Sequence, residues 1–178
     1  EFTEFTVSPL PNQINIDFIL CLLLYFLLNC LYSWKIKSLV LIDCFVLTTL
    51  YTLRVAAGAY ALEINISYWL LMFSTFIFFS LALLKRYTEL RLTAANALKE
   101  TEGRGYKHTD LSYVQNLGVS SGFISILVLA FYINSENIML LYDSPQIVWG
   151  ALPTLMLWLS WMWLQAQRGN MKDDPILF

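Results

Sequence analysis

Charged residues are scarce in this chain, which limits the classes of protein to which it can belong. They make up 13% of the 178 residues, while 58% of the residues are hydrophobic. Soluble domains usually contain about a quarter charged residues. The chain has no basic tract for nucleic acid, and no Gly/Ser-rich or Pro-rich linker separates domains. The composition indicates one membrane-embedded domain over residues 1–178, with the bilayer and not nucleic acid as its surroundings.

Histidine is almost absent, and the cysteines show no metal-binding or disulfide pattern. His108 is the only histidine, and the three cysteines, at positions 21, 30 and 44, each lie inside an apolar run. No Cys-x-x-Cys or Cys/His spacing occurs, and such spacings mark zinc sites and disulfide frameworks. We therefore expect neither in this chain, and we assign no metal ligand within it.

Long apolar stretches are what the chain does have. Each is long enough to cross about 30 Å of hydrocarbon as a helix. The fifth contains Pro153, where we expect a kink. The fold class is therefore predicted to be all-α, a polytopic transmembrane helical bundle with five spans at residues 14–34, 39–62, 68–84, 112–133 and 145–167.

The basic residues between these spans fall on one side of the membrane. Cytoplasmic loops of membrane proteins carry an excess of Lys and Arg, so this side is expected to be cytoplasmic and the N-terminus to lie outside. Of the eleven Lys and Arg, Arg54 alone is inside a span. The others are Lys35, Lys37, Lys85, Arg86, Arg91, Lys99, Arg104, Lys107, Arg168 and Lys172.

The connection at residues 85–111 is expected to be a cytoplasmic loop with a role of its own. Connections of this length in compact bundles are usually lids, binding loops or disordered segments. Apolar residues recur at helical spacing between Lys85 and Lys99, which predicts an amphipathic helix over the cytoplasmic end of the bundle. Glu89 is one turn from both Lys85 and Arg86 and can pair with either. Two glycines around Arg104 then interrupt this helix.

Two ionisable residues, Asp43 and Arg54, lie within the second span. Ionisable groups are costly in hydrocarbon and usually mark a site facing the bundle interior. Eleven residues separate the two, so they share one helix face but stand roughly 16 Å apart. Each needs its own partner. The structural alternative for Asp43 is an interfacial acid that pairs with nearby lysine or arginine, and for Arg54 it is extension to the outer interface.

Small residues and tryptophans are expected to serve packing. Ala56-Ala-Gly58-Ala and the pair Gly118 and Gly122 are typical of closely packed membrane helices. The tryptophans at positions 149, 158, 161 and 163 are expected to face mostly lipid and the interfacial belt.

Several motifs taken together resemble the UbiA-type membrane prenyltransferase superfamily. The branch that looks most similar comprises the polyprenyl-phosphate phosphoribosyltransferases, which include decaprenyl-phosphate enzymes. Lys85-Arg86-x-x-Glu89 stands where quinone-type members carry a second Asp-rich motif. The motifs are Tyr32-Ser33 and Lys37 ahead of Asp43, Tyr51-Thr-Leu-Arg54-Val-Ala-Ala-Gly58, Lys85-Arg86-Tyr-Thr-Glu89-Leu, Gly103-Arg104-Gly-Tyr106 and Arg168-Gly-Asn-Met-Lys-Asp173-Asp174-Pro175.

The resemblance implies a nine-helix bundle in which the five spans correspond to helices four to eight. The chain then looks like the later part of a longer enzyme, because the family's first Asp-rich motif is absent. In the family that motif binds Mg²⁺ and a diphosphate, so Mg²⁺ is an implied cofactor whose main ligands lie elsewhere. The implied partners are a polyprenyl phosphate, a diphosphate donor and the missing N-terminal part. The implied setting is a bacterial inner membrane and cell-envelope biosynthesis.

Site residues follow from the same resemblance. Asp43 and Lys85 are the expected catalytic residues. The expected substrate-binding residues are Lys37, Tyr51, Arg54, Arg86, Glu89, Arg104 and Tyr106.

Three functions remain open at the level of sequence. The first is phosphoribosyl transfer from phosphoribosyl diphosphate to a polyprenyl phosphate, with release of pyrophosphate. The second is prenyl transfer from a prenyl diphosphate to a small acceptor. The third is a non-catalytic membrane subunit or fragment, in which Asp43 and Arg54 only hold helices together. An Asp-rich cluster upstream of this stretch would distinguish the enzymes from the subunit.

Overall fold

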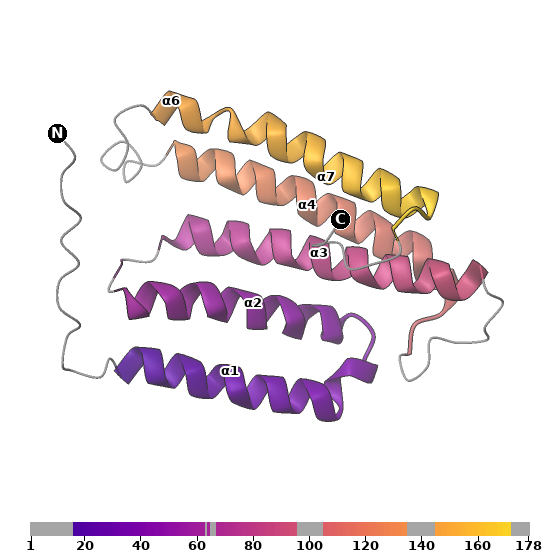
Figure 1. The fold of residues 1–178 in the computed structure, drawn as a ribbon, viewed down its shortest axis with the longest axis horizontal. Helices are drawn as coiled ribbons and strands as arrows, with labels where there is room; N and C mark the ends of the chain where they lie inside the picture. Colours follow the sequence, from indigo (N-terminus) through magenta and orange to yellow (C-terminus); the bar gives the residue numbers. More distant parts are fainter. Residues whose placement is uncertain (1–15, 63, 65–66, 96–104, 135–144, 172–178) are drawn as a thin grey trace.

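The computed structural model describes residues 16–62, 64, 67–95, 105–134 and 145–171, and these parts are helical with short connections (Figure 1). The long helices are α1 (Ile16–Trp34), α2 (Ile42–Ala61), α3 (Tyr68–Ala95) and α4 (Leu111–Ile133). These four helices are long and apolar enough to cross a membrane. The prediction of an all-α polytopic membrane bundle is therefore confirmed at this level.

The helices lie side by side in chain order, each packed mainly against the next (Figure 1). The last helix, α7 (Ala151–Arg168), returns against both α4 and α3. The apolar core lies on α3, α4 and α7 and also includes Cys44 of α2. By contrast, α1 presents most of its large apolar side chains outward, as a helix in contact with lipid does.

The third helix is longer than the sequence predicted. We expected its span to end at Leu84 and a separate helix to follow, but α3 continues unbroken to Ala95. Residues 85–95 contain no glycine or proline and include good helix formers. Tyr87 and Leu90 are buried in the main core, so packing holds the extension in line with the membrane segment. Part of the predicted 85–111 loop is therefore helix α3, and residues 96–104 lie outside the described parts.

The fifth span is interrupted before its proline. Two residues, Trp149 and Gly150, separate the short α6 (Pro145–Val148) from α7. The break is therefore at these residues, and the expected kink at Pro153 is wrong. Pro153 lies in the first turn of α7, where backbone N–H groups have no helical partner, so its missing N–H costs nothing. Because α7 is not one of the four helices apolar and long enough to span, the prediction of five spans is confirmed for four helices.

The two predicted glycine packing sites behave differently. A Cβ on Gly118 would overlap the ring of Trp163 and lie 3.2 Å from Leu83, so α4 uses this glycine to approach both α7 and α3. Gly122 similarly faces Ser80. A Cβ on Gly58 would meet nothing within 4 Å. Close packing at Gly58 is therefore wrong for the described residues, because no helix lies over that face of α2.

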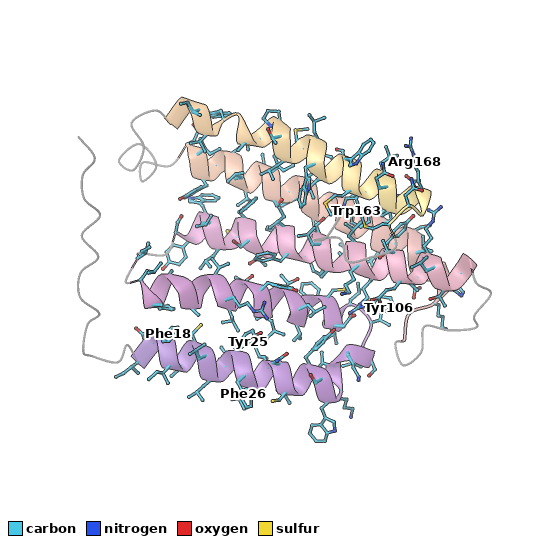
Figure 2. The ribbon with its side chains drawn as sticks, in the orientation of Figure 1. Phe18, Tyr25, Phe26, Tyr106, Trp163 and Arg168 are labelled. Atoms are coloured by element: carbon cyan, nitrogen blue, oxygen red, sulfur yellow. The ribbon has the colours of Figure 1, made fainter. Side chains whose placement is uncertain are left out.

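Trp163 also departs from expectation, because it is buried and not lipid-facing. Its ring covers Gly118, and its indole N–H donates to the Ser80 hydroxyl at 3.3 Å (Figure 2). The indole group has a hydrogen-bond partner, which makes its burial favourable. The other three tryptophans of this region, Trp149, Trp158 and Trp161, are exposed as predicted.

Gly118→Ala is expected to lower the free energy of unfolding by about 1–3 kcal/mol, the usual cost of overpacking a core. The added methyl group would overlap the Trp163 ring. Gly58→Ala is the matched control, since it adds the same group to a helix where there is room. Titration of the purified protein in detergent micelles with SDS measures both. Equal stabilities for the two variants would mean that α7 does not pack on Gly118.

Candidate functional site

A buried ion pair joins α2 to α3 at the end where both helices approach the 38–41 connection. The Asp43 side chain is 0% exposed and that of Arg86 is 2% exposed. Arg86 donates its Nε–H to Asp43 Oδ2. Asp43 is in the first turn of α2, where a carboxylate interacts favourably with the helix dipole. The expectation that Asp43 has a partner is confirmed, and the partner is a nearby arginine, as in the structural alternative for this residue.

Arg86 is held on three sides. Besides Asp43, its Nη1 donates to Glu89 Oε2 at 2.6 Å, one turn further along α3, and its Nη2 donates to the Tyr32 hydroxyl of α1 at 3.2 Å. The pairing of Glu89 with Arg86 that the helical spacing predicted is confirmed. A guanidinium carries five N–H donors, so these three bonds leave two directed elsewhere. The planar group is fixed in orientation by residues of three helices.

Tyr106, in the segment that leads to α4, also belongs to the cluster. Its hydroxyl donates to Asp43 Oδ1 at 2.6 Å and accepts the Leu41 backbone N–H at 2.8 Å. Both oxygens of Asp43 are thus bonded inside the protein. Burial raises the pKa of the Tyr106 hydroxyl, and the hydrogen bond to Asp43 raises it as well. The hydroxyl therefore stays protonated at physiological pH and remains a donor to Asp43.

The backbone around Tyr106 is docked on the connection between α1 and α2. The Gly105 N–H donates to the Ser38 carbonyl at 3.3 Å, and a Cβ on Gly105 would lie 3.2 Å from both that oxygen and Val40. Leu41, which donates to Tyr106, has φ 66° and ψ −37°, a conformation that is rare for a residue with a side chain. Such conformations persist where the surroundings impose them, often at functional sites. The cluster and its docked segment define the candidate site, which we call the Asp43 cluster: Tyr32, Asp43, Arg86, Glu89 and Tyr106.

The other predicted site residues divide into those near this cluster and those away from it. Lys85 precedes Arg86 on α3 and is half-buried, while Lys37 is exposed in the 3₁₀ turn η1 (Ile36–Ser38) that leads to α2. Arg104 lies outside the described residues. Tyr32 was not predicted as a site residue. The sequence offered its place at the end of α1, next to the basic turn, and its part in the Tyr32-Ser33 motif of the resemblance, but no role for its side chain.

Tyr51 and Arg54 form a separate cluster with Tyr25 of α1. Arg54 donates Nε–H and Nη2–H to the Tyr25 hydroxyl, and its Cζ lies 5.2 Å and 5.3 Å from the ring centres of Tyr25 and Tyr51. Figure 2 shows Tyr25 between α1 and α2. The structure therefore does not bring Arg54 or Tyr51 into the Asp43 cluster.

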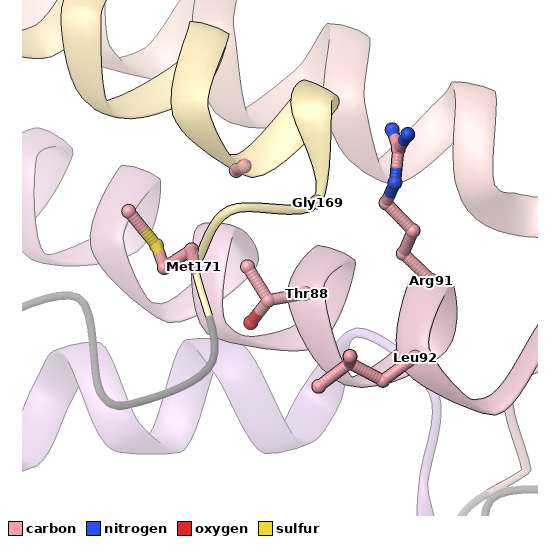
Figure 3. Close-up of a pocket in the computed structure, with 6 residues that line it drawn as sticks. Thr88, Arg91, Leu92, Gly169 and Met171 are labelled. Carbon is pink, nitrogen blue, oxygen red and sulfur yellow. The ribbon is translucent and has the colours of Figure 1, made fainter. Parts of the chain in front are cut away.

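A small cavity of about 90 Å³ lies elsewhere, between α3 and the end of α7 (Figure 3). It is lined by Thr88, Arg91, Leu92, Ala166, Gly169 and Met171. Gly169 ends α7 with φ 78°, and Arg91 Nε lies 3.4 Å from where its Cβ would be. A cation beside a helix C-terminus is stabilised by the dipole. We therefore interpret Arg91 as a cap for α7 and not as a ligand for a substrate anion, which the same helix end would repel.

Comparison with known proteins gives two relatives. The chain is 33% identical over 163 residues to the uncharacterized protein y4nM of Sinorhizobium fredii, a match covering 91% of this chain and 32% of that protein. It is 32% identical over 155 residues to the nodulation protein NoeC of Azorhizobium caulinodans, covering 86% of this chain and 50% of NoeC. The chain thus spans about a third and about half of these relatives. No family model and no solved structure matches it.

Proposed function

We propose that this chain is the part of an integral-membrane transferase of the UbiA type that holds a donor's phosphate groups beside a polyprenyl phosphate. The reaction is transfer of a 5-phosphoribosyl group from phosphoribosyl diphosphate, with release of pyrophosphate. One observation carries the proposal. Asp43, Arg86, Glu89 and Tyr106, which come from three separate motifs of the resemblance, meet in one buried cluster at one end of the membrane helices.

The roles of the side chains follow from their hydrogen bonds. In the reaction, a phosphate oxygen of the lipid forms a bond to the anomeric carbon of ribose while the bond to pyrophosphate breaks. Negative charge grows on the leaving group, and fixed cations stabilise it. Arg86 is buried and oriented by Asp43 and Glu89. We assign contact with the donor's phosphates to the half-buried Lys85 beside it. Arg86, whose side chain is 2% exposed, contributes its charge from inside the cluster.

Asp43 then acts as a positioning residue. The sequence allowed it either to polarise the ribose or to orient a basic residue. With Oδ1 bonded to Tyr106 and Oδ2 to Arg86, orientation is the role that its geometry favours. Exposed apolar surface on α1 and α2 is available to the lipid tail.

Magnesium does not fit the residues described. Within the described parts of the chain, no group of three His, Cys, Asp or Glu residues could hold a metal ion. Asp43 and Glu89 both bond Arg86, which competes with a cation for their oxygens. In the proposed reaction, Asp43 and Glu89 therefore orient Arg86 and do not bind a metal ion.

The test of the proposal uses the complete protein in membranes of the cell that makes it. Radiolabel in the ribose of phosphoribosyl diphosphate should appear in the organic-solvent phase only when polyprenyl phosphate is added. Label transferred only from a prenyl diphosphate to a small acceptor would identify the second enzymatic alternative. Transfer from neither donor would support a non-catalytic subunit, whose Asp43 cluster only joins helices.

The orientation of the bundle is a further expected result. The sequence assigns ten of the Lys and Arg to the segments on one side of the predicted spans, so the end bearing Lys107 is predicted to be cytoplasmic and the end bearing Asn134 external. Cysteines placed at these two exposed positions, in a Cys30→Ser background, measure this, because Cys21 and Cys44 are buried. A membrane-impermeant maleimide added to intact cells should label the cysteine at 134 and not the one at 107. The reverse pattern would invert the topology.

A further inference from the structure

The guanidinium of Arg54 lies near the middle of the membrane helices. Its partner Tyr25 lies at the centre of α1, nine residues from either end of that helix. Helical side chains lean towards the N-terminus of their helix, and the guanidinium indeed lies over Tyr51, in the preceding turn. It therefore points away from the nearer end of α2. The expected extension of Arg54 to the outer interface is wrong for this geometry.

The charge of Arg54 is not neutralised by the described residues. Among the described residues, Arg54 donates hydrogen bonds to the Tyr25 hydroxyl and lies over the rings of Tyr25 and Tyr51. The ion pairs in the described parts involve Arg86 instead. Arg54 is nevertheless exposed. An exposed cation at this depth would face hydrocarbon, which is costly, and such residues usually pair within a bundle.

The helix face beside Arg54 has room for another helix to pack on it. Gly58 is one turn away, on the same face, and a Cβ there would meet nothing within 4 Å. Leu62, one further turn along, is 71% exposed. Small residues allow membrane helices to approach closely, so the Arg54–Gly58 face combines an open apolar surface with an uncompensated positive charge.

We propose that this face is covered by a transmembrane helix from outside residues 1–178 that carries an Asp or Glu opposite Arg54. The carboxylate would bond the guanidinium, and the backbone of the added helix would approach at Gly58. The curated relatives support a source for such a helix, because the matched part is about a third of one and half of the other. This inference does not depend on the reaction proposed above.

Charge and depth argue against two other occupants of the Arg54–Gly58 face. A second copy of this chain related by a two-fold axis would place the same patch against itself and bring Arg54 towards another Arg54. A lipid phosphate would match the charge, but headgroups lie outside the hydrocarbon layer, whereas this guanidinium is level with the centre of α1. A carboxylate on a helix satisfies both the charge and the depth.

The experiment measures whether the face is covered in the complete protein. A nitroxide is attached at Leu62→Cys in a Cys30→Ser background, one turn beyond Gly58 on the same face, so that the close approach at Gly58 is left intact. The protein is placed in lipid vesicles with any subunit that copurifies. A doxyl-labelled lipid in the same vesicles gives the collision rate with oxygen for full lipid exposure. The proposal predicts that the label collides with oxygen at a rate well below this reference. The low rate should persist in Arg54→Lys and rise to the reference in Arg54→Glu. An Asp→Lys or Glu→Lys substitution outside residues 1–178 should restore protection to Arg54→Glu.

Three outcomes would overturn the proposal. A label at position 62 as accessible to oxygen as the lipid reference would show that lipid covers the face. Spin–spin broadening between labels at position 62 would show a second copy of this chain. Protection that persists in Arg54→Glu would show a covering helix without an acidic partner.

Discussion

Asp43→Ala is expected to lower the free energy of unfolding by about 3–5 kcal/mol, the usual cost of removing one member of a buried ion pair. The substitution leaves the Arg86 guanidinium buried, with only Glu89 and Tyr32 as its hydrogen-bond partners, and it removes the acceptor of the Tyr106 hydroxyl. Arg86→Met should cost a similar amount, because it leaves the Asp43 carboxylate buried with only Tyr106. SDS titration of the purified protein in detergent micelles measures both.

The double variant Asp43→Leu/Arg86→Met separates stability from function. Replacing both members of a buried pair with apolar residues of similar size is often neutral or stabilising. We therefore expect most of the lost stability to return, with an interaction energy of several kcal/mol between the two sites. Additive losses would mean that the two side chains do not interact in the folded protein, which would contradict the geometry of the cluster.

Lys85→Ala is expected to reduce turnover of the complete enzyme by at least about a hundredfold, the scale of losing one positioned electrostatic contact to a developing negative charge. Lys85 is half-buried and next to the oriented Arg86, so its loss should affect the bound phosphates more than the fold. Arg91→Ala is the matched control. It removes a cation from the same end of α3, but this cation lies beside Gly169 at the C-terminus of α7.

The readout is transfer of labelled ribose to the lipid, measured beside the unfolding free energy of each variant. We expect Arg91→Ala to keep turnover near that of the wild type while loosening the end of α7. If Lys85→Ala transferred label at the wild-type rate, Lys85 would have no part in the reaction. Loss of turnover in both variants would mean that this end of α3 needs both cations.

The membrane helices were predictable because they depend on composition, whereas their ends depend on packing. Apolar runs located α1, α2, α4 and the start of α3 within a few residues. The change to polar residues after Leu84 suggested a boundary, yet α3 continues because Tyr87 and Leu90 pack in the core. Gly118 and Gly58 sit in similar sequence patterns and still differ, since only the arrangement of neighbouring helices decides which glycine is covered.

The candidate site was partly predictable for a related reason. An acid inside an apolar span indicates a partner, and helical spacing paired Glu89 with Arg86. Which cation pairs with Asp43 depends on how far α3 extends, and the sequence did not predict that extension. The contribution of Tyr32 depended on α1 lying beside α3 at that end. Tyr25 carried no signal, because a tyrosine within an apolar span is ordinary until an arginine is found against it.

The most direct test of the central claim, that the Asp43 cluster is a functional site and not only a link between helices, is label transfer by the Asp43→Leu/Arg86→Met protein. The assay is the appearance of ribose label in polyprenyl phosphate, using complete protein whose SDS titration confirms that it is folded. The account predicts a folded protein whose turnover is at least about a hundredfold below wild type, because the oriented guanidinium is gone. Wild-type turnover by the folded double variant would contradict it.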